Sequence, residues 1–435
     1  MKPVNIGLLG LGTVGGGTAA VLQDNAAEIS RRLGREVRIS AVCDLSEEKA
    51  RQTCPSAAFV KDPFELVARE DVDVVVELFG GTSIAKDAVL KAIENGKHIV
   101  TANKKLLAEY GNEIFPLAEE KNVMVQFEAA VAGGIPIIKA LREGLAANRI
   151  RSIAGIINGT SNFILSEMRE KGSAFADVLK EAQALGYAEA DPTFDIEGND
   201  AGHKITIMSA LAFGTPMNFP ACYLEGISKL DSRDIKYAEE LGYRIKLLGI
   251  TRKTDKGIEL RVHPTLIPES RLLANVNGVM NAVRVNADMV GETLYYGAGA
   301  GALPTASAVV ADIIDIARLI EANTDHRVPH LAFQPAQVQA QTILPMDEIT
   351  SSYYLRVQAK DEPGTLGQIA ALLAKENVSI EALIQKGVID QTTAEIVILT
   401  HSTVEKNIKR AIEAIEALSC VEKPITMIRM ESLHD

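Results

Sequence analysis

Three glycines near the amino terminus, in the sequence GLGTVG at residues 10–15, have the spacing that binds the pyrophosphate of a dinucleotide. Glycine there allows a tight turn, close approach of the backbone to the phosphates, and packing of the next helix on the strand. The motif follows the apolar run Val4–Leu9 and precedes a predicted helix, whose N-terminus would face the phosphates. A structural glycine-rich turn is the alternative. The expected dinucleotide-binding residues are Gly10, Leu11, Gly12, Thr13, Val14 and Gly15.

An acidic residue is expected about 20 residues further on, at the end of the second strand. Asp44 takes this place, although the first crossover is longer than usual. Asp44 could accept hydrogen bonds from an adenosine ribose and would disfavour a 2′-phosphate, whereas the nearby Lys49 and Arg51 could reverse that preference. The sequence therefore leaves NAD and NADP both open.

A carboxylate and an ammonium group stand four positions apart, Asp200 and Lys204, at the start of a strongly apolar stretch. On a helix this spacing places both on one face. Composition alone would fit a solvated loop that caps the helix, but a charged pair leading into an apolar helix is more often paired and functional. The adjacent His203 points about 100° away around the helix and is expected to be structural.

Two further lysines follow a predicted strand in TANKK, residues 101–105. Ligands of open α/β sheets bind outside the carboxyl ends of the strands, so Lys105 could reach a substrate or cofactor. A solvated surface charge is the equally favoured alternative, because most lysines are exposed. Lys104 is expected at the start of a helix.

These residues require elements that position them, and the chain is α/β in pattern. Short β-branched runs alternate with amphipathic segments from Val4 to about Glu128, which predicts a parallel sheet in a Rossmann-type nucleotide-binding domain over residues 1–130. A helix over 305–321 is expected to complete it. Residues 131–320 predict an α+β catalytic and dimerisation domain, including a helix over Ile135–Ala147. Residues 321–350 are expected to be a linker, and 351–435 a βαββαβ unit.

Composition excludes several classes of function. The net charge of −12 has the wrong sign for a protein that binds nucleic acid or anionic lipid. The four cysteines form no metal-binding or disulfide pattern, and no stretch of about 20 apolar residues predicts a membrane span. We therefore expect a cytoplasmic protein with a small-molecule ligand, and neither a nucleic-acid nor a membrane partner.

Several motifs in order resemble those of homoserine dehydrogenases over nearly the whole chain: GLGTVG, TANKK, NGTSNFIL from Asn158, GYAEADPTFDIEGNDAGHK from Gly186 and GAGAGALPTASAVVAD from Gly297. The resemblance implies interconversion of L-homoserine and L-aspartate 4-semialdehyde with NADP or NAD, in threonine, methionine and isoleucine biosynthesis. The cofactor carries the hydride, and the protein supplies positioning and electrostatics.

Site residues follow from this resemblance motif by motif. Lys204 would donate and accept the substrate proton, and Lys105 would bridge substrate and nicotinamide. Two lysines converging on one site would lower each other's pKa towards the range useful for proton transfer. The implied cofactor-binding residues also include Asp44, Lys105 and Gly301, and the implied substrate-binding residues are Thr160, Glu189, Asp195 and Asp200.

The resemblance also implies a monovalent cation, usually sodium, held largely by main-chain carbonyls. The matching stretch EAAVAGGIP assigns it to Glu128, Val131, Gly133 and Ile135. Backbone oxygens suit a hard cation. A glycine-rich domain hinge is the alternative reading of this stretch.

The C-terminal unit, with its DEPGTLGQIA loop, resembles an ACT domain, which commonly pairs with a second copy and binds an amino acid. The implied effector is L-threonine, acting by feedback, with Asp361, Gly364 and Leu366 at the binding loop. A purely dimerising role is the alternative. The expected assembly is a homodimer or homotetramer.

Two competing functions are weaker. An aspartate-semialdehyde dehydrogenase needs a catalytic cysteine, and none of Cys43, Cys54, Cys222 and Cys420 has a suitable setting. A nucleotide-binding amino-acid sensor would have no use for a proton-transfer lysine.

Overall fold

The computed structural model describes residues 2–322, 327–388 and 393–433. Four residues of the predicted linker and six of the predicted C-terminal unit therefore lie outside the description. The chain divides into two compact units. The first contains residues 1–159, 200–222 and 279–341, and the second contains residues 160–199, 223–278 and 342–435.

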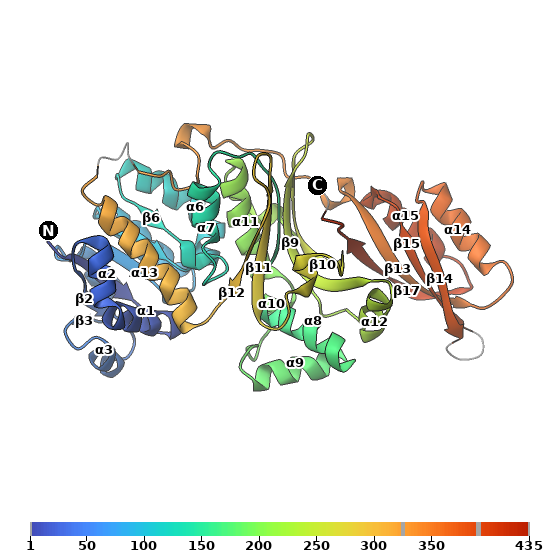
Figure 1. The fold of residues 1–435 in the computed structure, drawn as a ribbon, viewed down its shortest axis with the longest axis horizontal. Helices are drawn as coiled ribbons and strands as arrows, with labels where there is room; N and C mark the ends of the chain where they lie inside the picture. Colours follow the sequence, from blue (N-terminus) through green and yellow to red (C-terminus); the bar gives the residue numbers. More distant parts are fainter. Residues whose placement is uncertain (1, 323–326, 389–392, 434–435) are drawn as a thin grey trace. The chain divides into compact units, whose positions relative to one another are not determined.

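Six parallel strands form the nucleotide-binding sheet of the first unit, in the order β3-β2-β1-β4-β5-β6 (Figure 1). They are β1 (Val4–Leu9), β2 (Val37–Cys43), β3 (Ala58–Val60), β4 (Val74–Glu77), β5 (His98–Thr101) and β6 (Val125–Gln126). Every residue of β4 and β5 is buried, as a strand covered on both faces requires. The predicted Rossmann-type sheet is confirmed.

Seven helices of the first unit accompany this sheet: α1 (Thr13–Asp24), α2 (Ala26–Leu33), α3 (Glu47–Thr53), α4 (Pro63–Ala68), α5 (Ser83–Glu94), α6 (Lys104–Glu120) and α13 (Ala302–Leu319). α13 lies beside α1 and α2 (Figure 1), and its Val309, Ile313 and Ile316 join the core of the sheet. A Cβ on Gly17 would lie 2.6 Å from the Ala302 carbonyl, so glycine is what lets α1 and α13 approach. The helix α13, which follows β6 by many residues in the sequence, thus completes the nucleotide-binding fold.

The rest of the first unit is an antiparallel sheet and two helical segments. Its elements are β7 (Ile150–Ile156), β11 (Met280–Ala287), β12 (Gly291–Ala298), α7 (Ile137–Lys139) and α11 (Asn199–Phe213). The helix expected over Ile135–Ala147 is wrong in extent: it covers α7 and a π-helical turn, Ala140–Gly144. Pro136 disfavours helical geometry at the residue before it. At the other end the Leu145 N–H donates to the Ala140 carbonyl, five residues back.

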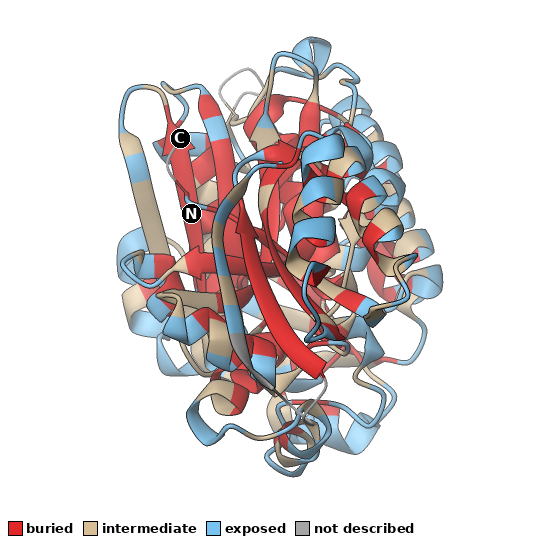
Figure 2. Cartoon of the chain, turned by 90° about the vertical axis from the view of Figure 1, so that its right-hand side faces the viewer, coloured by how far each residue is buried: buried red, intermediate tan, exposed pale blue. Residues whose placement is uncertain are grey.

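The second unit holds the remaining elements. Its strands are β8 (Tyr223–Leu224), β9 (Tyr243–Lys253), β10 (Ile258–Pro268), β13 (Thr350–Lys360), β14 (Ile380–Val388), β15 (Thr393–Thr400), β16 (Thr403–Val404) and β17 (Val421–Met430). Its helices are α8 (Gly159–Lys171, begun in the first unit), α9 (Phe175–Ala184), α10 (Thr193–Ile196), α12 (Ser232–Glu240), α14 (Thr365–Lys375) and α15 (Glu405–Glu416). In Figure 2 the long strands are coloured as buried over much of their length, whereas the helices carry exposed outer faces.

The C-terminal βαββαβ unit is confirmed, with strand order β17-β13-β15-β14. Its strand β17 also pairs in parallel with β10, at Thr265 with Arg429, so both strands lie in the same compact unit. A buried ion pair reinforces the connection: Arg356 Nε on β13 donates to Asp234 Oδ1 on α12 at 2.6 Å. One continuous sheet therefore joins the C-terminal unit to β9 and β10.

Candidate active site

The glycine loop has the geometry of a phosphate cradle. Gly10 adopts a φ of +94°, and a Cβ on Gly15 would lie 2.0 Å from the Gly10 carbonyl. Gly12 is exposed at the N-cap of α1, whose first turn carries no acidic residue. Thr13 is exposed and Val14 half-buried, whereas the Leu11 side chain lies in the core. The backbone at Gly12 can therefore approach an anion at the positive end of α1.

Asp44 follows β2 and braces this loop. Its carboxylate accepts the Leu11 N–H at 2.7 Å and the Ser46 N–H at 3.0 Å. The neighbouring Arg51 pairs with Glu47 at 2.6 Å. Asp44 is thus at the expected end of the second strand, and in this structure it holds the glycine loop in place.

The buried carboxylate of Asp200 contacts two ammonium groups at the centre of the candidate site. Lys204 Nζ on α11 donates to Asp200 Oδ2 at 2.7 Å, as the four-residue spacing predicts, and Lys104 Nζ lies 2.9 Å from Asp200 Oδ1. Asn158 Nδ2 donates to Oδ2 at 2.8 Å. The Ile157 carbonyl accepts a further hydrogen bond from Lys204 Nζ at 2.7 Å. The strand-to-helix junction after β7 therefore fixes both members of the pair.

The electrostatics of Asp200 follow from this arrangement. Burial raises the pKa of the carboxyl, but the charges of Lys204 and Lys104 outweigh burial and hold it below its ordinary value. The Lys204 side chain is only 9% exposed, so its ion pair is largely screened from water. Lys204 Nζ is thus held by two acceptors, the Asp200 carboxylate and the Ile157 carbonyl.

The structure brings Lys104, not Lys105, to this cluster. Lys105 is about half exposed, and its Nζ lies 3.9 Å from Glu109 one turn along α6. The expectation for Lys105 is thus not supported by its placement, because consecutive residues of a helix point about 100° apart. His203 is buried with its ring 4.1 Å from that of Phe219, and burial lowers its pKa to about 4, in line with the expected structural role.

A buried glutamate that sequence reasoning missed organises the loops after β4 and β5. Glu77 accepts a hydrogen bond from Thr101 Oγ1 at 2.6 Å and from the Gly80 N–H at 3.1 Å. The Thr101 hydroxyl also accepts the Asn103 N–H at 3.0 Å, and Asn103 Nδ2 donates to the Gly81 carbonyl at 2.7 Å. Glu77 therefore positions the turn from which α6 and Lys104 start. An acid ending an otherwise apolar strand was its only signal in the sequence.

The other expected substrate residues belong to the second unit. Thr160 Oγ1, in the first turn of α8, donates to the Tyr187 carbonyl at 2.6 Å. Glu189 is exposed, and its carbonyl accepts a hydrogen bond from Gln183 Nε2. Asp195 is half-buried on α10, and its carbonyl accepts from Ser161 Oγ. The turn before α10 is thus tied to the start of α8.

The stretch expected to hold a cation is a buried, irregular loop. Ala132 and Gly133 both adopt positive φ, +54° and +43°. The Glu128 and Ile135 carbonyls accept backbone hydrogen bonds from Val131 and Ile137, whereas no backbone N–H in the described loops donates to the Val131 or Gly133 carbonyl. The Glu128 carboxylate instead accepts the N–H groups of residues 138 and 139 at the start of α7.

The expected effector residues line one cavity of about 450 Å³ in the C-terminal unit. Gly364 has a φ of +96° and caps α14. Asp361 Oδ1 accepts a hydrogen bond from Gln385 Nε2 at 3.1 Å, and Leu366 lies in the first turn of the helix. The loop between β13 and α14 is therefore open to a small ligand.

Other chemistries find little support. Burial raises the pKa of Cys43 and Cys54 to about 11 and that of Cys222 to about 12, so none is a ready nucleophile. The described residues hold no group of three or more His, Cys, Asp or Glu side chains placed to share a metal ion. Nor, over the same residues, does any helix combine the length and apolar character needed to cross a bilayer.

The glycine loop, the parallel sheet and the buried lysine cluster define an NAD(P)-dependent oxidoreductase, and family models match in the same order. The NAD-binding domain of homoserine dehydrogenase matches residues 10–128, homoserine dehydrogenase itself matches 136–314, and the ACT domain matches 353–420. The chain belongs to the homoserine dehydrogenase family.

Individual relatives span the whole chain. It is 94% identical over 435 residues to a homoserine dehydrogenase of Neisseria gonorrhoeae, covering 100% of both. A crystal structure of a homoserine dehydrogenase from Thiobacillus denitrificans is 61% identical with a TM-score of 0.95, covering 100% of this chain and 99% of that one. A hyperthermophilic archaeal homoserine dehydrogenase in complex with NADPH is 30% identical with a TM-score of 0.62, covering 74% and 100%.

Proposed function

We propose that this protein interconverts L-homoserine and L-aspartate 4-semialdehyde, with NADP or NAD, in the biosynthesis of threonine, methionine and isoleucine. The observation that carries the proposal is the Asp200 carboxylate with Lys204 on one oxygen and Lys104 on the other. The nicotinamide, when bound, supplies the carbon that accepts or gives the hydride. The glycine loop, Gly10–Gly15, fits the pyrophosphate. Asp44 follows the end of β2, and Gly301 precedes α13.

Lys204 is the proposed proton-transfer group at the substrate oxygen. In the reducing direction its ammonium donates a proton to the aldehyde oxygen, and in the oxidising direction its amine accepts the hydroxyl proton. Asp200 favours the charged form, and the Ile157 carbonyl orients Nζ. Asp200 is therefore proposed to position the two lysines, whereas the family resemblance implies a substrate-binding role for it.

Lys104 is the proposed second lysine. The ammonium of Lys104 contacts the same carboxylate. The residue is the first of α6, at the carboxyl edge of the sheet, where cofactor and substrate meet in such folds. It replaces Lys105 in that role. Thr160, Glu189 and Asp195 remain the proposed substrate-binding residues, supported by the ties between α8 and the 187–195 turn.

The loop over 128–135 is proposed to hold a monovalent cation, sodium by preference. The residues fit because Val131 and Gly133 are buried and their carbonyls accept no backbone N–H from the loops that the structure describes, and consecutive positive φ values turn the chain tightly there. Oxygen ligands of this kind suit a hard cation. Its role would be structural.

The ACT domain is proposed to bind L-threonine at Asp361, Gly364 and Leu366 and to lower the rate by feedback. The open cavity beside the β13–α14 loop supports this, as does the continuous sheet that links the domain to β10. Assembly as at least a homodimer is proposed as well: the edge strand β12 and the turn before it expose Met289, Val290 and Tyr296. A cytoplasmic location stays a prediction.

The test is initial-rate oxidation of L-homoserine with NAD and with NADP, each with and without L-threonine. We expect turnover with at least one cofactor and a lower rate with threonine. Folded protein that binds a cofactor but turns over neither would contradict the proposed activity. Turnover unaffected by threonine would contradict the regulatory part alone.

A further inference from the structure

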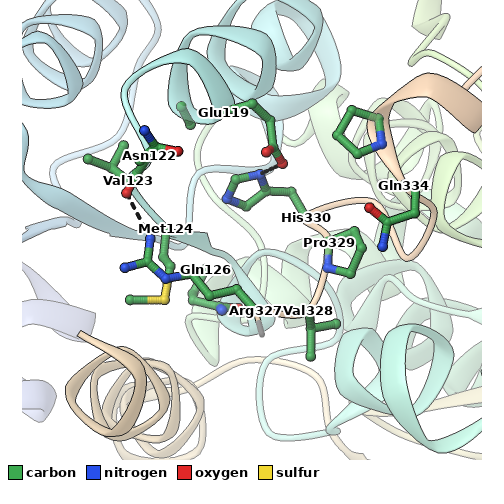
Figure 3. Close-up of a pocket in the computed structure, with 12 residues that line it drawn as sticks. Glu119, Asn122, Val123, Met124, Gln126, Arg327, Val328, Pro329, His330 and Gln334 are labelled. Carbon is green, nitrogen blue, oxygen red and sulfur yellow. Dashed lines mark hydrogen bonds and ion pairs between the residues drawn. The ribbon is translucent and has the colours of Figure 1, made fainter. Parts of the chain in front are cut away.

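A polar pocket lies at the amino-terminal end of β6 in the first unit (Figure 3). Its volume is about 250 Å³, and its wall comes from the end of α6, from β6 and from residues 327–335. Because the strands run parallel, this end belongs to the edge of the sheet opposite the glycine loop. The pocket is therefore distinct from the nucleotide site, and its volume suits a small metabolite.

An acceptor group in the pocket wall lacks a donor. Gln126 is only 5% exposed, and among the residues that the structure describes its Oε1 has no hydrogen-bond partner. Buried side-chain oxygens are normally satisfied. The Gln126 amide thus favours an occupant that carries an N–H or O–H donor.

The guanidinium of Arg327 forms no ion pair with a carboxylate among the residues that the structure describes. Arg327 Nη1 donates to the Asn122 carbonyl at 2.7 Å, while its buried Nε has no partner within the described part of the chain. Burial lowers the pKa of the guanidinium, and the charge of Glu119 only partly offsets this. A carboxylate on the occupant would compensate the buried charge.

A negative group completes the pocket. His330 Nδ1 lies 2.9 Å from Glu119 Oε1, and its Nε2 accepts the Val125 N–H at 3.1 Å. Because Nε2 accepts this N–H, Nδ1 is the ring nitrogen that faces Glu119. The hydrogen bond with His330 lowers the pKa of Glu119, which favours its charged form, so the pocket offers both a positive and a negative group (Figure 3).

We propose that this pocket binds a free α-amino acid. Its carboxylate pairs with Arg327, and its ammonium donates to Gln126 Oε1 within the field of Glu119. Val123, Val328 and Pro329 leave an apolar wall for a small side chain. An α-hydroxy acid would pair with Arg327 but would lack the positive charge that Glu119 favours. This site does not depend on the proposed activity or on the ACT cavity.

The test is calorimetric titration of the full chain with each proteinogenic L-amino acid. We expect at least one to bind, with affinity lowered tenfold or more in Gln126→Met and in Arg327→Gln. Gln126→Met keeps the length of the side chain and removes the amide that carries the unsatisfied acceptor, so it decides the question if Arg327→Gln fails to fold. The α-hydroxy acid with the same side chain is expected to bind at least tenfold more weakly than the amino acid.

A matched control separates this site from the effector cavity. Asp361→Ala changes the ACT loop and is expected to leave the Gln126-dependent binding unchanged. Binding lost in Asp361→Ala but kept in Gln126→Met would overturn the proposal, as would the absence of any amino-acid binding, which would leave only solvent in the pocket. Equal affinity for the hydroxy acid would overturn the assignment to amino acids.

Discussion

Lys104 and Lys204, a hundred positions apart in the chain, bind different oxygens of one buried carboxylate, that of Asp200, at 2.9 and 2.7 Å. The first lysine starts the helix after β5, and the second lies on α11. A single acidic side chain therefore sets the separation of two cations, and a change at any member of the cluster acts on the other two.

Lys204→Ala should lower kcat by roughly two orders of magnitude or more, the usual scale of lost general acid–base catalysis. Cofactor affinity should not change, because Lys204 contacts Asp200 and Ile157 and not the glycine loop. The measurements are steady-state rates and cofactor titration by fluorescence. Near-normal turnover would reject the role of Lys204.

Lys104→Ala should lower kcat/KM at least tenfold, whereas Lys105→Ala should stay within about twofold of wild type. The two residues are adjacent on α6, but only Lys104 reaches Asp200. Lys105→Ala is therefore a matched control for loss of a positive charge on this helix. The opposite ranking would restore Lys105 as the second lysine.

Asp44→Ala should raise KM for NAD and for NADP together. The carboxylate accepts the Leu11 N–H at 2.7 Å, so its removal loosens the loop on which both cofactors depend. Steady-state titrations of each cofactor measure this. If KM for NADP fell while that for NAD rose, Asp44 would act as a selector against the 2′-phosphate and not as a brace.

Lys246, a buried lysine on β9, should make stability depend on alkaline pH. Its Nζ donates to the Val276 carbonyl at 2.6 Å, and burial lowers its pKa from 10.5 to about 7. Between pH 7 and pH 10.5 Lys246 is protonated in the unfolded chain and deprotonated in the folded chain, so the free energy of unfolding rises with pH over this range. The gain is complete above pH 10.5 and is lost as pH falls towards 7. The effect is at most about 1.4 kcal/mol per pH unit.

The unfolding free energy of wild type minus that of Lys246→Met should therefore rise from pH 7 to pH 9 and stay level below pH 7. Urea denaturation at fixed ionic strength gives both values. A difference that is flat across the alkaline range would show that Lys246 stays charged when folded.

Asp361→Ala should raise the concentration of L-threonine needed for half inhibition at least tenfold, because it removes an acceptor from the effector cavity. Rates without threonine are measured in parallel. Unchanged inhibition would place the effector elsewhere. Truncation near residue 350 is a poorer test, because it also removes β13, which contacts Asp234 on α12, and β17, which pairs with β10.

Local signals in the sequence predicted much of the fold and part of the site. The strand, glycine turn and helix over residues 4–24 depend on neighbouring residues, and so does the Asp200–Lys204 pair on one helical turn. Hydrophobic period and turn chemistry are enough for such features.

Features set by distant parts of the chain could not be predicted. Two adjacent lysines look equivalent until the position of α11 is known. The sequence motif therefore indicates Lys105, whereas Lys104 contacts Asp200 in the structure. The role of Glu77 depends on Thr101 from the next strand. The pocket at Gln126 depends on residues 327–335, which form part of its wall. The pairing of β10 with β17 likewise has no local signature.

That last pairing bears on how the protein is made. β17, Val421–Met430, is the last of the described strands, and β10 lies about 160 residues earlier in synthesis. Until β17 has been made, Thr265 and Leu266 of β10 and the edge of β13 that pairs with β17 stay open, with unpaired backbone groups that can recruit a neighbouring nascent chain. Loss of β17 alone would therefore leave an open strand edge within the second unit, and we expect aggregation of such a chain to outweigh any loss of regulation.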